Sequence, residues 1–234
     1  MVSIEQLLAD VATAYAQLDP PTWPDPHPDL SEPREEEYSR VSDPERYRVV
    51  HLRARAWVTV LKARGARVED PHAVPTGAER AVLVGPPRGD ALPLLLIEAE
   101  AEIGPGESQA SLSVAVADAR HVVEELPQCG CDACDDGSEH LLEAIDEAIL
   151  SVVGGTFVML QGDGWQAQLH DLGESSTNTD HDKAMQICHR LATGQSVALR
   201  EDTDTLVGHS WFRPAESAHD VNLAVPPPEP TPPR

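Results

Sequence analysis

The spacing of apolar residues along the chain predicts four amphipathic helices. In each of them apolar side chains recur every three or four residues, which places them on one helix face. Local signals set the ends: Ser3 suits an N-cap, Pro44 stands at the tolerated first helical position, and Gly65 terminates the second helix. The predicted helices span residues 4–18, 44–64, 137–153 and 180–193.

Other segments have the short apolar runs or strict alternation that are typical of β-strands. Residues 94–103 and 108–118, joined by a Gly-Pro-Gly turn, are predicted to form an antiparallel hairpin, and residues 156–161 and 165–172, joined by Gly-Asp-Gly, a second one. Further strands are expected at residues 80–85, 196–201 and 205–212.

Alternation in the first hairpin predicts one buried face and one solvated face. The expected buried set is Ile97, Ala99, Ala101 and Ile103 on one strand, with Ala110, Leu112, Val114 and Val116 on the other. The acids between them, Glu98, Glu100 and Glu102, are therefore expected on the exposed face, opposite serines or arginines.

This order of elements predicts an α+β fold in which a mostly antiparallel sheet packs with about four helices, because direct hairpins outnumber crossover helices. We expect a single domain over residues 1–222, with a proline-rich surface segment at residues 20–33. Residues 223–234 are expected to form a disordered, proline-rich tail. Its part from Pro226 onward is expected to be dispensable for folding, since it has no apolar side chains to pack.

The net negative charge of the chain makes nucleic acid an unfavourable partner. The chain carries 40 acids against 17 bases, a formal net charge of −23, which opposes binding to a nucleic acid backbone. The bases gather on the second helix, where a solvated face paired with acids is a simpler interpretation than an anion site. These residues are Arg46, Arg48, Arg53, Arg55, Lys62 and Arg64.

No segment has the length and hydrophobicity of a membrane span, and the N-terminal residues do not resemble a signal peptide. The expectation is therefore a cytoplasmic protein that binds neither membranes nor nucleic acid. The sequence also contains no glycine-rich phosphate loop and no His-Glu-x-x-His motif.

The most specific chemistry lies in the stretch QCGCDACDDGSEH at residues 128–140. Its Cys-x-Cys-x-x-Cys spacing brings three thiols onto one tight turn, as a metal site requires. The predicted site is a structural zinc clip with Cys129, Cys131 and Cys134 as ligands. For the fourth ligand we expect Cys188 on the fourth helix, with His140, His189 or Asp135 as alternatives.

Three other interpretations of this stretch stay open. A calcium loop would use Asp132, Asp136 and Glu143, but Cys134 stands where calcium needs an oxygen ligand. A dithiol redox centre would use the Cys-x-x-Cys pair, although the adjacent acids oppose thiolate formation. A purely structural turn would have Asp136 as the cap of the third helix.

The run Cys-Gly-Cys-Asp-Ala-Cys-Asp at residues 129–135, together with DPERYRVVHLRARAW at residues 43–57, resembles an uncharacterised actinobacterial family known only as a domain of unknown function. The resemblance extends to about Trp211 and implies no reaction. The expected function is thus that of a non-catalytic, metal-clipped protein that binds a partner protein or a small ligand. The alternatives are an enzyme that uses the cysteine loop for redox or metal-dependent chemistry and an interaction module with a structural cysteine turn.

Overall fold

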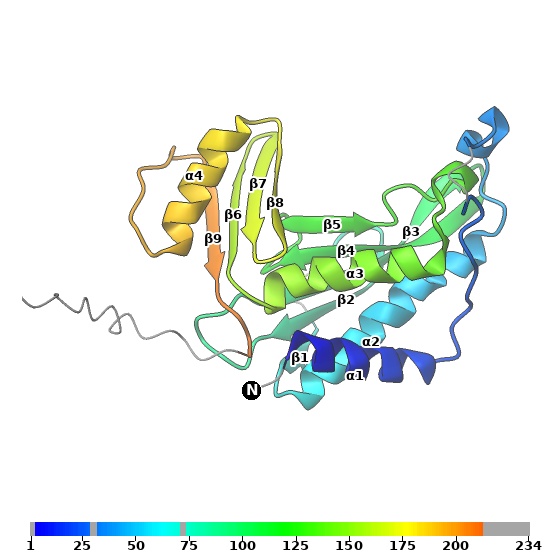
Figure 1. The fold of residues 1–234 in the computed structure, drawn as a ribbon, viewed down its shortest axis with the longest axis horizontal. Coiled ribbons are helices and arrows are strands. Elements are labelled where there is room, and N and C mark those ends of the chain that lie inside the picture. Colours follow the sequence, from blue (N-terminus) through cyan, green and yellow to red (C-terminus); the bar gives the residue numbers. More distant parts are fainter. Residues whose placement is uncertain (1–2, 29–31, 71–73, 213–234) are drawn as a thin grey trace, which may run out of the picture.

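The computed structural model describes residues 3–28, 32–70 and 74–212 and has two antiparallel sheets with four α-helices in these ranges (Figure 1), which confirms the predicted α+β class. The α-helices are α1 (Ile4–Ala16), α2 (Val49–Ala63), α3 (Gly137–Val153) and α4 (His181–Ala192). The short 3-10 helices are η1 (Glu35–Ser39), η2 (Pro44–Arg48) and η3 (Asp132–Cys134). Of the helices in the described ranges, none is long and apolar enough to cross a membrane. The predicted tail at residues 223–234 lies outside these ranges.

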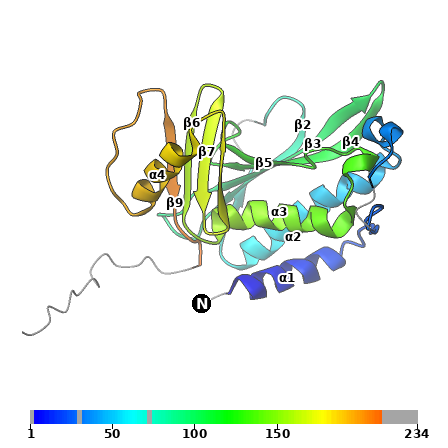
Figure 2. The ribbon, with the colours of Figure 1, turned by 45° about the horizontal axis from the view of Figure 1, so that its top comes forward.

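The larger sheet has five strands in chain order, and every neighbouring pair is antiparallel. The strands are β1 (Arg67–Glu69), β2 (Ala78–Gly85), β3 (Leu94–Gly104), β4 (Glu107–Val116) and β5 (Val122–Leu126). The hairpin of β3 and β4 was predicted from its alternation, whereas β1 and β5 were not predicted. Helices α1, α2 and α3 lie together against one face of this sheet (Figure 2).

The main hydrophobic core lies between that sheet face and the three helices. Leu96 of β3 and Val114 of β4 are cross-strand partners, and both are buried in this core together with Trp57 of α2. Ile145 and Ile149 enter it from α3. The inward face expected for β4 is therefore confirmed.

The face predicted for β3 is wrong at Glu98. Glu98 is the cross-strand partner of the core residue Leu112 and is only 3% exposed, on the side of the sheet that faces the helices. Its carboxylate accepts hydrogen bonds from Arg55 Nη2 at 2.5 Å and Arg80 Nη1 at 2.6 Å. The arginine of α2 allows a carboxylate to occupy a position where alternation alone indicates either solvent or an apolar side chain. Ile97 lies on the opposite face, in a separate small cluster with Leu95.

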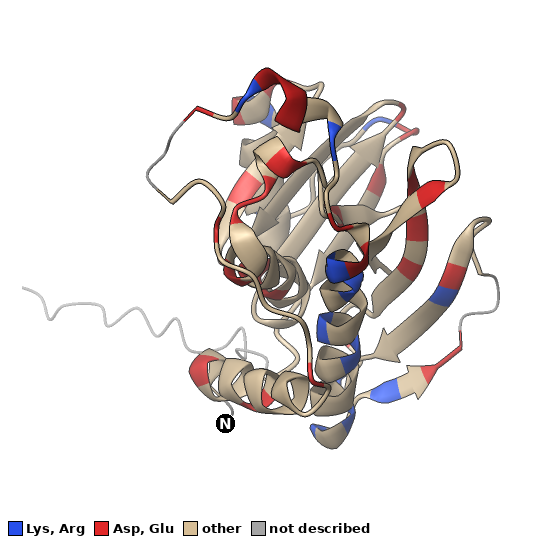
Figure 3. Ribbon diagram, turned by 90° about the vertical axis from the view of Figure 1, so that its right-hand side faces the viewer, with Lys and Arg blue, Asp and Glu red and all other residues tan. Residues whose placement is uncertain are grey.

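Basic residues recur along α2 (Figure 3). Arg53 and Arg55 of this helix are paired with acids, as expected from the sequence, but not both are solvated. Arg53 is only 6% exposed, and its Nε donates to Asp146 of α3 at 2.8 Å. The indole N–H of Trp57 donates to the same carboxylate at 2.7 Å. The expected solvated face is thus wrong at Arg53, because α3 covers this side of α2 and supplies a buried counter-charge.

The smaller sheet stands at one end of the larger one and has the strand order β8-β7-β6-β9 (Figure 1). Its strands are β6 (Phe157–Gly162), β7 (Trp165–His170), β8 (Gly173–Thr177) and β9 (Asp204–Gly208). Gln166 and Gln168 of β7 donate side-chain hydrogen bonds to the carbonyls of Val122 and Val123 in β5. These bonds join the edge strand β5 of the larger sheet to the inner strand β7 of the smaller sheet.

The hairpin of β6 and β7 is confirmed, and β9 begins one residue before the strand predicted at residues 205–212 and ends four residues earlier than predicted. The strand predicted at residues 196–201 is wrong, since residues 195–200 form neither helix nor strand. Helix α4 packs on β6 and β7 through a second small core. Its N-cap is Asp180, whose side chain accepts a hydrogen bond from the backbone N–H of Lys183.

Candidate metal centre

The cysteine stretch connects β5 at the edge of the larger sheet to the start of α3. Cys129 and Cys131 lie in the loop after β5, and Cys134 ends η3. Three residues later Gly137 begins α3 with φ of +84°, a left-handed conformation that favours glycine. A Cβ atom at Gly137 would lie 2.6 Å from the backbone nitrogen of Asp25. Glycine therefore lets the proline-rich segment pass directly against the helix start.

The three thiols converge, as the spacing predicted. The sulfur atoms of Cys129, Cys131 and Cys134 all lie within 4.8 Å of one another, and those of Cys129 and Cys131 are 3.3 Å apart. Four sulfurs around zinc at about 2.3 Å would be roughly 3.8 Å apart, so this cluster is near the size of a zinc site. Cys131 is buried, whereas Cys129 and Cys134 are exposed, and all three are free of disulfides.

Hydrogen bonds within the cysteine cluster shift the thiol pKa values of Cys129 and Cys134 in opposite directions. A hydrogen bond from the backbone N–H of Cys131 lowers the pKa of the Cys129 thiol. The hydrogen bond between Cys134 and Cys131, together with burial, raises the pKa of Cys134 to about 12. A divalent cation bound at the cluster would therefore have to displace the proton of Cys134 before that sulfur could act as a thiolate ligand.

Gly130 is required between the first two cysteines because β4 lies close behind the loop. A Cβ atom at position 130 would lie 2.0 Å from Oε1 and 2.1 Å from Nε2 of Gln109. Gln109 is 5% exposed, and its Oε1 has no hydrogen-bond partner among the described residues. The Cys-Gly-Cys turn thus rests directly on a buried side-chain amide, a contact that sequence patterns do not indicate.

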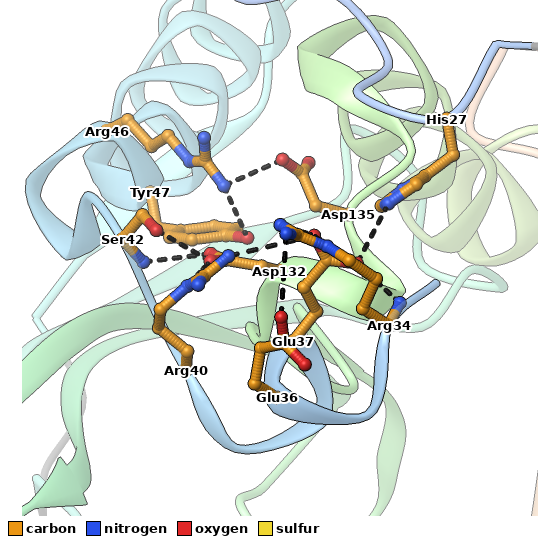
Figure 4. A network of polar contacts seen from close by, with 10 residues as sticks. All are labelled: His27, Arg34, Glu36, Glu37, Arg40, Ser42, Arg46, Tyr47, Asp132 and Asp135. Carbon is orange, nitrogen blue, oxygen red and sulfur yellow. Dashed lines mark hydrogen bonds and ion pairs between the residues drawn. The ribbon is translucent and has the colours of Figure 1, made fainter. Parts of the chain in front are cut away.

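Asp132, in the middle of the motif, is held by protein groups (Figure 4). Its carboxylate accepts Arg40 Nε at 2.6 Å, the Ser42 backbone N–H at 2.8 Å and the Ser42 hydroxyl at 2.6 Å. Burial alone would raise its pKa, but the hydrogen bonds from Ser42 and Arg40 hold the pKa of Asp132 below its usual value. An anchored Asp132 is not available as the first ligand of a calcium loop.

Asp135 is anchored in the same way (Figure 4). It accepts hydrogen bonds from the indole N–H of Trp23 at 2.8 Å, from Arg46 Nη2 at 2.7 Å and from the backbone N–H of Gly137 at 3.0 Å. The guanidinium of Arg46 also stacks on Trp23 and Tyr47, 5.0 Å and 5.2 Å from the ring centroids.

The cap by Asp136, which the interpretation as a purely structural turn included, is not present at the start of α3. Asp136 makes no side-chain capping bond, and Asp135 satisfies the backbone N–H of Gly137 instead. Ser138 completes the helix start, because its backbone N–H and its hydroxyl both donate to the carbonyl of Trp23 at 3.1 Å. The proline-rich segment thus supplies the partners that the first turn of α3 lacks.

Two of the residues expected as the fourth ligand, Cys188 and His189, lie outside the cysteine cluster. Cys188 is fully buried in the core between α4 and the smaller sheet, with Val158 and Met185, and is not part of the thiol cluster. His189 points to Glu174 of β8, with Nε2 3.4 Å from Oε2. The structure therefore does not bring Cys188 or His189 to the three thiols.

His140 and Asp135 are close in sequence but are also outside the cluster of ligand atoms. His140 lies on the first turns of α3 and lines the cavity described next, together with Asp135. Within the described residues, the group of ligand atoms close enough to share one ion consists of the three cysteine sulfurs.

A cavity of about 710 Å³ opens beside the thiols, between β5, α3 and the β7–β8 hairpin. Cys129 and Cys134 line its wall next to His140, and His170 of β7 lines it from the smaller sheet. Burial lowers the pKa of His170, so its ring is neutral at physiological pH. The volume lies within the roughly 300–1,000 Å³ range of small-molecule sites. The sequence could not indicate this cavity, because its walls come from both sheets.

Fold and site together define an α+β protein with a three-cysteine cluster beside a cavity. Residues 10–215 match the family of unknown function DUF6226, and the chain belongs to that family. This confirms the expectation of a domain of unknown function over most of the sequence. Comparisons with curated proteins and with solved structures gave no match.

Proposed function

We propose that the protein is a cytoplasmic, non-catalytic zinc protein that binds a small ligand in the cavity beside its metal centre. The convergence of three free thiols within 4.8 Å is the observation that carries this proposal. Soft thiolate ligands favour zinc over the hard cations, and three thiolates on one short loop match the ligand spacing of zinc sites. Free thiols also fit a reducing cytoplasm.

The proposed zinc ion would not be the only group that holds the cysteine loop in place. Asp132 and Asp135 already attach the loop to Arg40, Ser42, Trp23 and Arg46. The metal is therefore not needed to neutralise these two carboxylates, and we expect it to add stability to a loop that is largely formed. This anchoring also supports the alternative of a structural cysteine turn, so metal content decides between the two.

Nucleic acid is not among the proposed partners. Four basic side chains on α2 and next to its ends are paired with acids: Arg46 with Asp135, Arg53 with Asp146, Arg55 with Glu98 and Arg64 with Asp10. Arginines that already hold carboxylates are poor phosphate ligands, and the net charge of −23 repels a polyanion.

The test is elemental analysis of protein purified without a histidine tag. We expect about one zinc per chain, lost in Cys131→Ser and retained in the matched control Cys188→Ala, whose thiol lies in the second core. Chelation should lower the melting temperature of the wild type and leave that of Cys131→Ser unchanged. Protein that contains no metal, takes up none from added zinc and shows three freely titratable cluster thiols would establish the structural turn instead.

A further inference from the structure

We propose that the fourth coordination position of the metal is filled by the sulfur of a small cationic thiol, an aminothiol, bound in the adjacent cavity. This inference rests on the proposed metal site and names the class of ligand that the site takes. Four observations support it: an open coordination position, the placement of the thiols, the charge of the cavity and the softness of the ligand set.

The coordination position is open because the described residues bring three ligand atoms together, and Asp135, one of the candidates for the fourth, is engaged elsewhere. Asp135 is held by Trp23, Arg46 and Gly137, and moving it to a metal would leave the partly buried Arg46 without its carboxylate. Structural zinc sites are usually closed by four protein ligands, whereas a site with three protein ligands keeps a position for an exogenous group.

The open position faces the cavity. Cys129 and Cys134 line the cavity wall, while the buried Cys131 is not among its lining residues. An ion held by all three sulfurs is therefore shielded by protein on the side of Cys131 and accessible on the cavity side. Apolar side chains of Leu126, Leu141 and Ala144 form part of the same wall, which suits a ligand with a short hydrocarbon body.

The cavity is acidic. Glu124, Asp136 and Glu147 line it, together with Asp135, whose charge is balanced by Arg46, and its described lining residues include neither lysine nor arginine. Three thiolates around a divalent ion add a further net negative charge. A carboxylate or phosphate ligand would be repelled by this field, whereas an ammonium group on the ligand is attracted to Glu124 and Glu147.

A thiol matches the remaining requirement. The three soft sulfur ligands favour a soft fourth ligand, and coordination to the ion deprotonates a thiol. On binding, the metal–sulfur bond forms, the S–H bond of the ligand breaks, and its proton passes to solvent. No electron is transferred, so the step needs neither an oxidant nor a reductant.

The experiment uses the full chain loaded with Co²⁺, whose visible bands report tetrahedral geometry and whose near-ultraviolet thiolate charge-transfer band reports the number of bound sulfurs. Addition of cysteamine should increase the charge-transfer band about 1.3-fold, the ratio of four thiolates to three, and keep the tetrahedral bands. Ethanolamine, which has the same charge but no sulfur, should have no effect. Mercaptoacetate, an anionic thiol, should require at least about tenfold higher concentration.

Variants test the charge argument and the competing ligand. Glu147→Gln should narrow the difference between cysteamine and mercaptoacetate, whereas Glu143→Gln should not, since Glu143 is exposed on the same helix but does not line the cavity. His140→Gln should leave the cobalt spectrum before addition of thiol unchanged. A changed spectrum in that variant would make His140 the fourth ligand and overturn the inference.

The remaining outcomes separate this inference from the proposed function. Tetrahedral cobalt bands that do not respond to cysteamine would refute the aminothiol ligand and leave the metal site intact. Release of cobalt by cysteamine, measured after desalting, would refute it as well. Absence of cobalt binding altogether, in wild type as in Cys131→Ser, would refute the metal site itself.

Discussion

The indole N–H of Trp23 donates a hydrogen bond of 2.8 Å to Oδ1 of Asp135, a residue 112 positions further along the chain. Through this bond the proline-rich segment holds the end of the cysteine motif and the first turn of α3. Arg46 neutralises the same carboxylate at 2.7 Å, so one acid joins three separate parts of the sequence. The cysteine loop is therefore positioned by its acids as well as by its thiols.

Replacement of Asp135 by asparagine should destabilise the protein. The side chain of Asp135 is 4% exposed and that of Arg46 is 17% exposed, so the variant leaves a largely buried guanidinium without its counter-charge. We expect a loss of about 2 kcal/mol in the free energy of unfolding, since asparagine can still accept the hydrogen bond from Trp23. Urea denaturation measures the change.

The matched control is Asp136→Asn, at the exposed acid next in the chain. It should change stability by no more than about 0.5 kcal/mol, as is usual for surface substitutions. Equal effects of the two variants would show that Asp135 contributes only general charge and that its bonds to Trp23 and Arg46 do not stabilise the fold.

A second prediction concerns Glu98 and acidic pH. Burial alone would raise the pKa of Glu98, but hydrogen bonds and charge from Arg55 and Arg80 outweigh burial and hold its pKa below the usual value. A group whose pKa is lower in the folded state stabilises the fold above its unfolded pKa, about 4.3, and loses that contribution as the pH falls through the folded value. Glu98→Gln should therefore lower the free energy of unfolding by about 1–2 kcal/mol at pH 7 and by progressively less below about pH 4. The effect is modest because both arginines are partly exposed.

Chemical denaturation of wild type and Glu98→Gln over pH 3–7 tests this behaviour. Glu100→Gln is the control, since Glu100 lies two residues further on the same strand and is exposed. A difference between wild type and Glu98→Gln that stays constant over this range would mean that ionised Glu98 contributes nothing through its arginines.

Sequence patterns predicted the parts of this protein that depend on local periodicity. The four helices and the two hairpins follow from spacing, and the convergence of the three thiols follows from a motif only six residues long. Alternation failed at Glu98 because a residue distant in the sequence, Arg55, changes what a buried position can accept. The pairing of Arg53 with Asp146 escaped prediction for the same reason.

Sequence patterns could not predict the contacts and the cavity around the cysteine cluster, because these also depend on residues distant in the sequence. A single sequence contains no pattern that links Trp23 to Asp135, which are 112 positions apart. The cavity likewise depends on tertiary structure, because it forms where β7 packs against β5. Cys188 matched the predicted ligand type but belongs to the core beneath α4. Residue type and helix face identify a candidate ligand, whereas tertiary packing decides whether it reaches the metal.

The third prediction concerns Gly130, between the first two cysteines. In Gly130→Ala the new Cβ would lie 2.0 Å from Oε1 of Gln109, so either the cysteine turn or the glutamine must move. Gln109 is 5% exposed and has little room to move, so we expect a loss of about 1–2 kcal/mol in the free energy of unfolding. We also expect weaker zinc binding, because displacement of the turn separates Cys129 from Cys131.

The control is Gln109→Ala, which removes the side chain that the new Cβ would meet. In that background Gly130→Ala should cost much less stability and should retain zinc. A double-mutant cycle with chemical denaturation and metal titration measures both effects. Additive effects of the two substitutions would contradict the direct contact and place the effect of Gly130→Ala in the loop backbone alone.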